Sequence, residues 1–137
     1  MKKLLTVLAF MAAISAHAQK EIKIDELSSY TGDSVTVKGK IFGVRYLESA
    51  KNTPTFINVG GAFPNQLLTI VIWGDVRKKL SYAPEEEPYV NGFTKVSGRV
   101  ELYRGKPQIV VTNPSQLSIL YDAEVPASQV PQIERKN

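Results

Sequence analysis

Alternating apolar and polar side chains mark the segment 34–41 as a half-buried β-strand. Valine, glycine or isoleucine occupies its odd positions and polar residues lie between them, which places alternate side chains on opposite faces of a sheet. Beyond Phe42 and Gly43 the phase reverses, because Val44 and Tyr46 now take the apolar positions. A change of phase at a glycine is typical of a bulge, so the pattern predicts a long, bent first strand.

Further segments of the chain are predicted as strands. Residues 55–59 form one, and residues 67–73 form a central one, because only Thr69 among them is polar. Residues 94–103 alternate, and a hairpin turn at 104–106 follows. The inward positions of that alternating strand are predicted to be Val96, Gly98, Val100 and Leu102. The remaining predicted segments are a last strand at 108–112 and its candidate extension at 117–120.

Two short helices complete the predicted elements. The first covers residues 24–30, and the second lies between the third and fourth strands, with Asp75 capping its free amides and Pro84 at its end. The side chains that share the apolar face of the second helix are Val76 and Leu80. The acidic run 85–87 that follows is predicted to be a solvated loop.

The order of the main elements is strand, strand, strand, helix, strand, strand. A long, bent first strand and a helix between strands three and four are the layout of the OB fold. The sequence therefore predicts an all-β protein with a short helix, built as a five-stranded OB-fold Greek-key barrel. A six-stranded barrel or a small sandwich is the alternative arrangement of the same segments.

The first eighteen residues have the composition of a secretory signal. Lysines at positions 2 and 3 precede an apolar run at 4–14, and Ala16 and Ala18 supply the small residues of a cleavage site before Gln19. A membrane anchor is the alternative, but the run is shorter than a spanning helix requires. We expect a periplasmic or secreted protein without membrane insertion, comprising a cleaved signal at 1–18, a single domain at 19–121 and a flexible tail at 122–137.

Removal of the signal changes the available chemistry. The chain has no cysteine, and its single histidine is His17, so the exported protein offers neither a thiolate nor an imidazole for catalysis or metal binding. The net charge falls from +4 to +2, because two of the 17 basic residues and none of the 13 acidic residues leave. The remaining carboxylates form no catalytic motif. We expect a non-catalytic protein with no cofactor and no metal site.

Several motifs together resemble a known family. They are Tyr30-x-Gly32-x-x-Val35-x-Val37-x-Gly39-Lys40-Ile41, Pro54-Thr55-Phe56-Ile57-Asn58-Val59-Gly60, Phe63-Pro64-Asn65-Gln66, Ile70-Val71-Ile72-Trp73 and Tyr103-x-Gly105-Lys106-Pro107-Gln108-Ile109. The segment that carries them is similar to small exported bacterial OB-fold domains described as nucleic-acid-binding, which are related to anticodon-binding OB folds. The resemblance implies the fold and leaves the ligand open, because OB folds bind single strands, oligosaccharides, proteins and small molecules.

The ligand groove of an OB fold lies on the outer face of its second and third strands and in the adjoining loops. With Ile57, Ile70 and Ile72 facing inward, Phe56 and Trp73 face this groove; their alternative place is the core. Aromatic rings stack on bases and basic loops attract phosphates. The candidate binding residues are Arg45, Tyr46, Lys51, Phe56, Asn58, Trp73, Tyr103, Arg104 and Lys106.

Two kinds of partner suit such a groove. Single-stranded nucleic acid is the first, because basic and aromatic side chains alternate around the groove. A protein or a glycan, bound by an exported adaptor through the same groove, is the alternative. Phosphate binding weakens steeply as salt rises, whereas an apolar or glycan site responds little, so salt dependence separates the two.

The signal assignment predicts that the exported protein begins at Gln19. N-terminal sequencing or an intact mass of material recovered outside the cytoplasm checks this prediction, and a retained Met1 would refute it.

Overall fold

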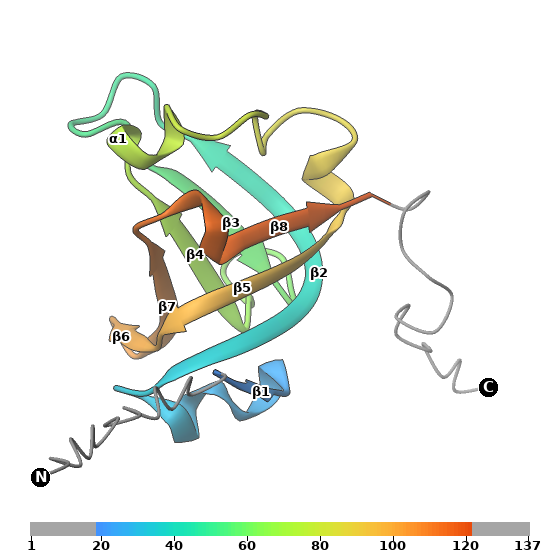
Figure 1. Cartoon of the computed structure of the whole chain (residues 1–137), viewed down its shortest axis with the longest axis vertical. Coiled ribbons are helices and arrows are strands. Elements are labelled where there is room, and N and C mark those ends of the chain that lie inside the picture. The colour runs from blue at the N-terminus through green and yellow to red at the C-terminus, as the bar shows by residue number, and fades with distance from the viewer. Residues whose placement is uncertain (1–18, 122–137) are drawn as a thin grey trace, which may run out of the picture.

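The computed structural model describes residues 19–121; the predicted signal at 1–18 and tail at 122–137 lie outside the described residues. The described part of the chain forms eight β-strands, one α-helix and three 3₁₀ helices (Figure 1). In chain order they are β1 (Lys20–Ile22), η1 (Ile24–Tyr30), β2 (Ser34–Tyr46), β3 (Thr55–Val59), β4 (Leu68–Ile72), α1 (Gly74–Arg77), η2 (Tyr89–Asn91), β5 (Phe93–Arg99), β6 (Glu101–Tyr103), β7 (Lys106–Val111), η3 (Pro114–Gln116) and β8 (Leu117–Leu120). None of these helices is long and apolar enough to cross a membrane.

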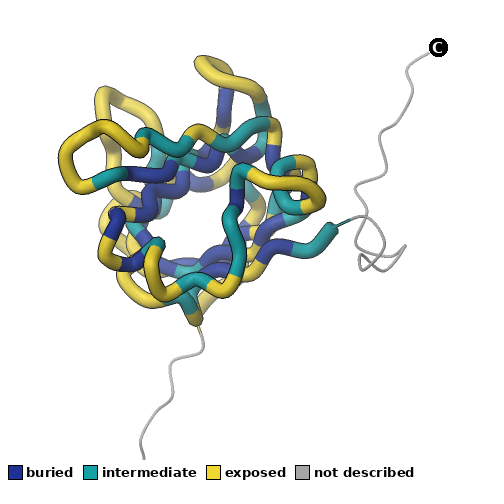
Figure 2. Tube along the Cα trace, turned by 90° about the horizontal axis from the view of Figure 1, so that it is seen from above, coloured by how far each residue is buried: buried dark blue, intermediate teal, exposed yellow. Residues whose placement is uncertain are grey.

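All the described strands belong to one mainly antiparallel sheet. Its hydrogen-bonded order is β6-β7-β4-β3-β2-β5-β8, and β1 pairs in parallel with β2 beside this path. β4 and β7 are also parallel. In this order β6 lies at one edge and β5 lies next to β8 at the other edge. Only Val100 separates β5 from β6 in the sequence, so the chain itself links the two edges of the open sheet. The buried stretches of the chain follow the strands, while most connecting loops are exposed (Figure 2).

The expectation of a five-stranded closed barrel is wrong in the number of strands and in closure. The predicted strand at 94–103 is divided: β5 pairs with β2, whereas β6 pairs with β7. The division falls at Val100 because its amide donates to the carbonyl of Asp33 and its carbonyl accepts from the amide of Gly32, so neither group is available to a neighbouring strand. Residues 117–120 form β8, antiparallel to β5, instead of extending the last predicted strand.

The predicted bend of the first strand is confirmed in β2. Residues 34–40 pair with β5, residues 41–46 pair with β3, and the register shifts between Ile41 and Gly43. Gly39 lies where these two pairings meet. A Cβ atom there would be 2.6 Å from Cγ1 of Val59 and 3.1 Å from Cδ1 of Ile24, so a side chain would push the layers apart at the bend.

Most inward positions predicted from the alternation are confirmed by burial. The isoleucines of β3 and β4 have no exposed surface, and neither do Val96 and Val100. Leu102 is the exception, with 51% of its surface exposed. It belongs to β6, which is the edge strand of the hydrogen-bonded order. The alternation of side chains continues in β6, but no other element packs over Leu102 there.

The helix predicted before Pro84 is present but short. α1 ends at Arg77, and its N-cap is Trp73 instead of the predicted Asp75. The Asp75 carboxylate does accept a hydrogen bond, from the amide of Val76 at 2.9 Å. Leu80 lies beyond the helix and packs against the core from there, because α1 is too short to carry both apolar residues on one face.

An ion pair between Arg77 and Glu85 corrects the expectation that residues 85–87 are all solvated. Both terminal nitrogens of Arg77 donate to the Glu85 carboxylate, Nη1 at 2.8 Å, and Nη1 also donates to Oγ1 of Thr55 at 3.0 Å. The side chains of Arg77 and Glu85 are only 16% and 26% exposed. The hydrogen bonds from Arg77 lower the pKa of the Glu85 carboxyl group.

Replacement of Gly98 by valine is expected to destabilise the fold. A Cβ atom at Gly98 would lie 2.7 Å from Cγ2 of the fully buried Ile109 and 3.2 Å from Nε2 of Gln116. Overpacking of a close-packed core costs about 1–3 kcal/mol. A thermal melt checks this, with Gly43→Ala as the control, because a Cβ atom at Gly43 would meet no atom within 4 Å. A Gly98→Val protein with the wild-type midpoint would contradict the tight contact between β5 and β7.

Replacement of Glu85 by glutamine is expected to reduce stability more at neutral pH than in acid. A carboxyl group with a lowered pKa in the folded state stabilises the protein above its unfolded pKa, and this contribution disappears as the pH falls through the folded value. Loss of such a hydrogen-bonded charge costs about 1.5–3 kcal/mol. Urea unfolding at pH 7 and pH 3 checks the difference. Glu86→Gln is the matched control, because Glu86 is exposed; equal losses from both variants would rule out a special role for the ion pair.

Candidate nucleic-acid interface

The outer surface of β3, β4, β7 and β6 is the structure's counterpart of the predicted groove, and we call it the binding face. Strand register sets its side chains in rows, since residues directly opposite each other point to the same side of a sheet. The row nearest α1 comprises Arg45, Phe56, Val71 and Val110. The middle row comprises Asn58, Thr69, Gln108 and Glu101. At the hairpin end, Lys106 lies opposite Tyr103.

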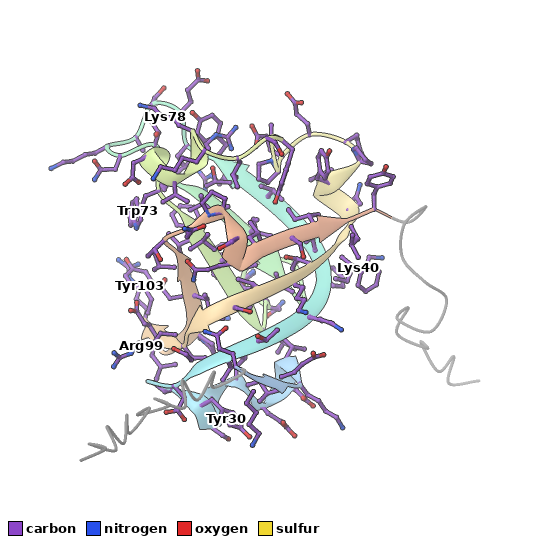
Figure 3. All side chains as sticks on the ribbon, in the orientation of Figure 1. Tyr30, Lys40, Trp73, Lys78, Arg99 and Tyr103 are labelled. Carbon is purple, nitrogen blue, oxygen red and sulfur yellow. The ribbon has the colours of Figure 1, made fainter. Side chains whose placement is uncertain are left out.

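Aromatic rings are exposed at both ends of this face. Trp73 follows the last residue of β4 and is 39% exposed, and Tyr103 on β6 is 58% exposed. Figure 3 shows both on the same side of the molecule. Phe56 lies on β3, opposite Val71 of β4, and is partly buried. Val71 also has the outward phase, yet it is 3% exposed, because it lies in register between Phe56 and Val110 within the row.

Basic side chains accompany the rings. Arg45 is exposed and lies opposite Phe56. Arg104 and Gly105 form the hairpin turn with φ angles of 50° and 79°, the two positive values that suit the twist of a β-hairpin. The Arg104 guanidinium is 5.4 Å from the centroid of the Tyr103 ring. The ammonium group of Lys106 donates to the carbonyl of Pro64, which holds the hairpin against the loop between β3 and β4.

Lys51 belongs to a loop that is fixed beside Trp73. The amide of Gly74 donates to the carbonyl of Asn52 at 2.8 Å, and a Cβ atom at Gly74 would lie 2.0 Å from Oγ1 of Thr53. Thr53 has φ 39°, a strained value for a β-branched residue. An open hollow of about 580 Å³ results, lined by Asn52, Thr53, Trp73, Gly74, Asp75 and Lys78. It leaves room for a planar group beside the indole.

Tyr46 is the predicted site residue that the structure does not bring to the binding face. It pairs with Thr55, which is fully buried, and therefore has the inward phase of β2. The Arg77 guanidinium lies over the Tyr46 ring, 3.5 Å from its centroid. A ring occupied in this way supports the core and is not available to stack on a ligand.

Polar residues that sequence reasoning had not assigned to the site lie in the middle of the binding face. Gln108 could have been found from the alternation of residues 108–111. Gln66 had no such signal, because it lies in the loop before β4. Its side-chain amide donates to Oγ1 of Thr69 at 3.1 Å, and its buried Oε1 has no hydrogen-bond partner among the described residues. The partly exposed amide of Gln108 can donate to and accept from the edges of a planar ligand, whereas the buried side chain of Gln66 fixes Thr69 from below.

No group of three or more His, Cys, Asp or Glu side chains that could hold a metal ion occurs within residues 19–121.

Comparisons with known proteins relate this fold to a part of larger proteins. No protein-family model and no curated protein matches the chain. A predicted aspartyl-tRNA synthetase from Leishmania major Friedlin is 10% identical, with a TM-score of 0.53 over 81% of this chain and 22% of that chain. The aspartyl-tRNA synthetase of Entamoeba histolytica is 15% identical, with a TM-score of 0.46 over 81% of this chain and 23% of that chain. The asparaginyl-tRNA synthetase of the same organism, in complex with asparaginyl-adenylate, is 19% identical, with a TM-score of 0.43 over 79% of this chain and 25% of that chain.

The likeness to the Leishmania structure shows a shared fold. The chain spans a quarter or less of the length of these synthetases. Together, the sheet topology and this likeness define an OB-fold-like β protein, and its binding face lies where such folds carry their ligands.

Proposed function

We propose that this protein is a non-catalytic module that binds single-stranded nucleic acid on the binding face. The observation that carries the proposal is the arrangement of exposed rings and cations on one surface. Trp73 and Tyr103 lie at its two ends, and Arg104 and Lys106 adjoin Tyr103. Rings stack on bases irrespective of sequence, and cations neutralise the phosphates between them.

In this proposal each part of the face has a different task. Trp73 borders the hollow and stacks on a base, a contact worth about 1–3 kcal/mol. The phosphates of the nucleic acid are bound through the positive charges of Arg45, Arg104 and Lys106. Gln108 lies on β7, between the strands that lead to the two rings, and Asn58 lies in the same row on β3; the amides of both residues hydrogen-bond to base edges or sugars. The likeness of the fold to part of a tRNA synthetase and the resemblance to nucleic-acid-binding OB domains both support this use of the face.

A protein or glycan partner is the alternative, and one observation favours an apolar partner. Phe63 is 75% exposed and Leu67 is 41% exposed. Both belong to the loop that Lys106 holds through Pro64, so they adjoin the hairpin end of the binding face. An adaptor would use them as an apolar anchor, and its binding would respond little to salt.

We also propose that the protein acts outside the cytoplasm, in the periplasm or as a secreted protein. This part of the proposal rests on the composition of residues 1–18 and on the small residues before Gln19.

The experiment uses Trp73, the single tryptophan of the chain, as its own reporter. Titration with short DNA and RNA single strands at low salt is expected to quench its fluorescence, because a stacked base contacts the indole directly. Trp73→Ala is expected to weaken binding of a labelled strand about 5- to 150-fold at low and high salt alike, the equivalent of about 1–3 kcal/mol. Trp73→Phe, which keeps a ring, is the matched control and should recover part of the affinity.

The paired change Arg104→Asn with Lys106→Gln is expected to act differently. Asparagine tolerates the positive φ of position 104, so the turn is kept while both charges are removed. The slope of log affinity against log salt should flatten by about 0.7 for each lost phosphate contact. Thermal melts must show that each variant is folded. A wild-type protein that binds no single strand at low salt would refute the nucleic-acid proposal and leave the adaptor.

A further inference from the structure

A second set of basic residues lies outside the binding face, on the outer surface of β2 and β5. Lys38 lies directly opposite Lys95 in the antiparallel register, Lys40 is opposite Phe93, and Arg99 is opposite Ser34. All four basic residues are exposed. We call this set, Lys38, Lys40, Lys95 and Arg99, the basic stripe.

The basic stripe is poorly neutralised by the protein itself. Like charges directly opposite each other on a sheet are destabilising. Glu21 is 3.3 Å from the Lys38 ammonium, but the two side chains are 55% and 43% exposed, and such surface pairs contribute little. No carboxylate of the described residues lies within ion-pair distance of Lys40, Lys95 or Arg99. The charge is therefore available to an external anion.

The stripe is continuous with the binding face. β5 leads through Val100 directly into β6, and the odd positions of both strands, from Lys95 to Tyr103, are outward. In Figure 3, Arg99 lies near Tyr103 on one side of the molecule and Lys40 lies on the opposite side. At that far end, the ammonium of Lys40 is 5.8 Å from the ring centroid of Phe42. Phe42 is itself 49% exposed, so the stripe ends at a further ring.

Its length suits several nucleotides. The rows that contain Arg99 and Lys40 are six residues apart along β2, which corresponds to about 20 Å at the rise of a β-strand. A chain of phosphates fits this line of cations better than a single anion, because the charges are spread along the strands. The ring of Phe42 at the end is suited to stacking on a base.

We propose that a single strand which leaves the binding face at Tyr103 continues along the basic stripe to Phe42. This inference rests on the proposed function, and it adds a second segment of contacts that only long strands reach. The sugar-phosphate backbone of the strand contacts Arg99 first and then the opposed pair Lys38 and Lys95. Lys40 and Phe42 bind the far end of the strand. Glu101 lies outward between Arg99 and Tyr103 and opposes the passage of phosphates.

The test compares oligothymidylates of 5 and 20 nucleotides with the purified protein at several salt concentrations. The double variant Lys38→Gln with Lys95→Gln is expected to leave the affinity for the 5-mer unchanged. For the 20-mer, it should reduce the slope of log affinity against log salt by about 1.4, which is about 0.7 for each of two lost contacts. Removal of two opposed like charges relieves repulsion, so this variant should fold at least as well as wild type. Glu101→Gln should strengthen binding of the 20-mer.

Lys79→Glu is the matched control, because it lowers the net charge by the same two units at an exposed lysine just after α1, which lies away from the stripe and outside the lining of the hollow beside Trp73. Equal slope losses in the control and the stripe variant would overturn the inference in favour of overall charge. An unchanged 20-mer slope in the stripe variant would overturn it while leaving the proposed function intact, provided that the 5-mer binds. A stripe variant that loses as much affinity for the 5-mer as for the 20-mer would also overturn the inference. Failure of both lengths to bind wild type would refute the proposed function itself.

Discussion

β2 hydrogen-bonds to β5 along its first half and to β3 along its second half, and it changes partner where Gly39 leaves space for Val59 and Ile24. A side chain at this position would separate the two layers that the strand connects. The register shift after Ile41 then turns the second half so that Val44 faces inward. Every other strand takes its position from β2 directly or through a neighbour, so this close approach determines the curvature of the whole sheet.

A sheet that curves in this way has two outward surfaces, which are carried by different strands. Its inner surface is closed by isoleucine and valine side chains with almost no exposed area, which leaves the alternate positions on the outside. On β3, β4, β7 and β6 these positions carry rings and amides, and on β2 and β5 they carry lysines and an arginine. The junction at Val100 makes the two surfaces continuous. The proposed single-stranded ligand carries both bases and phosphates, which correspond to the two kinds of surface.

Whether a basic side chain contributes to stability or is available for binding depends on the groups that surround it. Arg77 is partly buried and is satisfied by Glu85, Thr55 and the face of Tyr46, so it stabilises the end of the sheet near α1. Lys95 and Arg104 have solvent around them and no acidic partner within the described residues. Charge that folding has already neutralised contributes to stability, whereas charge left exposed is available for binding.

Local patterns in the sequence determined most of the strands, the bend at residues 41–43 and most of the inward positions, because a period of two and a glycine act within a few residues of chain. They also predicted the hairpin at Arg104, whereas they left Trp73 open between the groove and the core, and only the structure placed it outside. Tertiary structure alone decided which strands pair. β5 and β6 continue the same alternation, but β5 pairs with β2 and β6 pairs with β7, because the backbone groups of Val100 between them bond to Gly32 and Asp33. It likewise decided that Tyr46 lies beneath Arg77 and that Lys38 faces Lys95, since such contacts join residues far apart in the chain and depend on register, which no local period specifies.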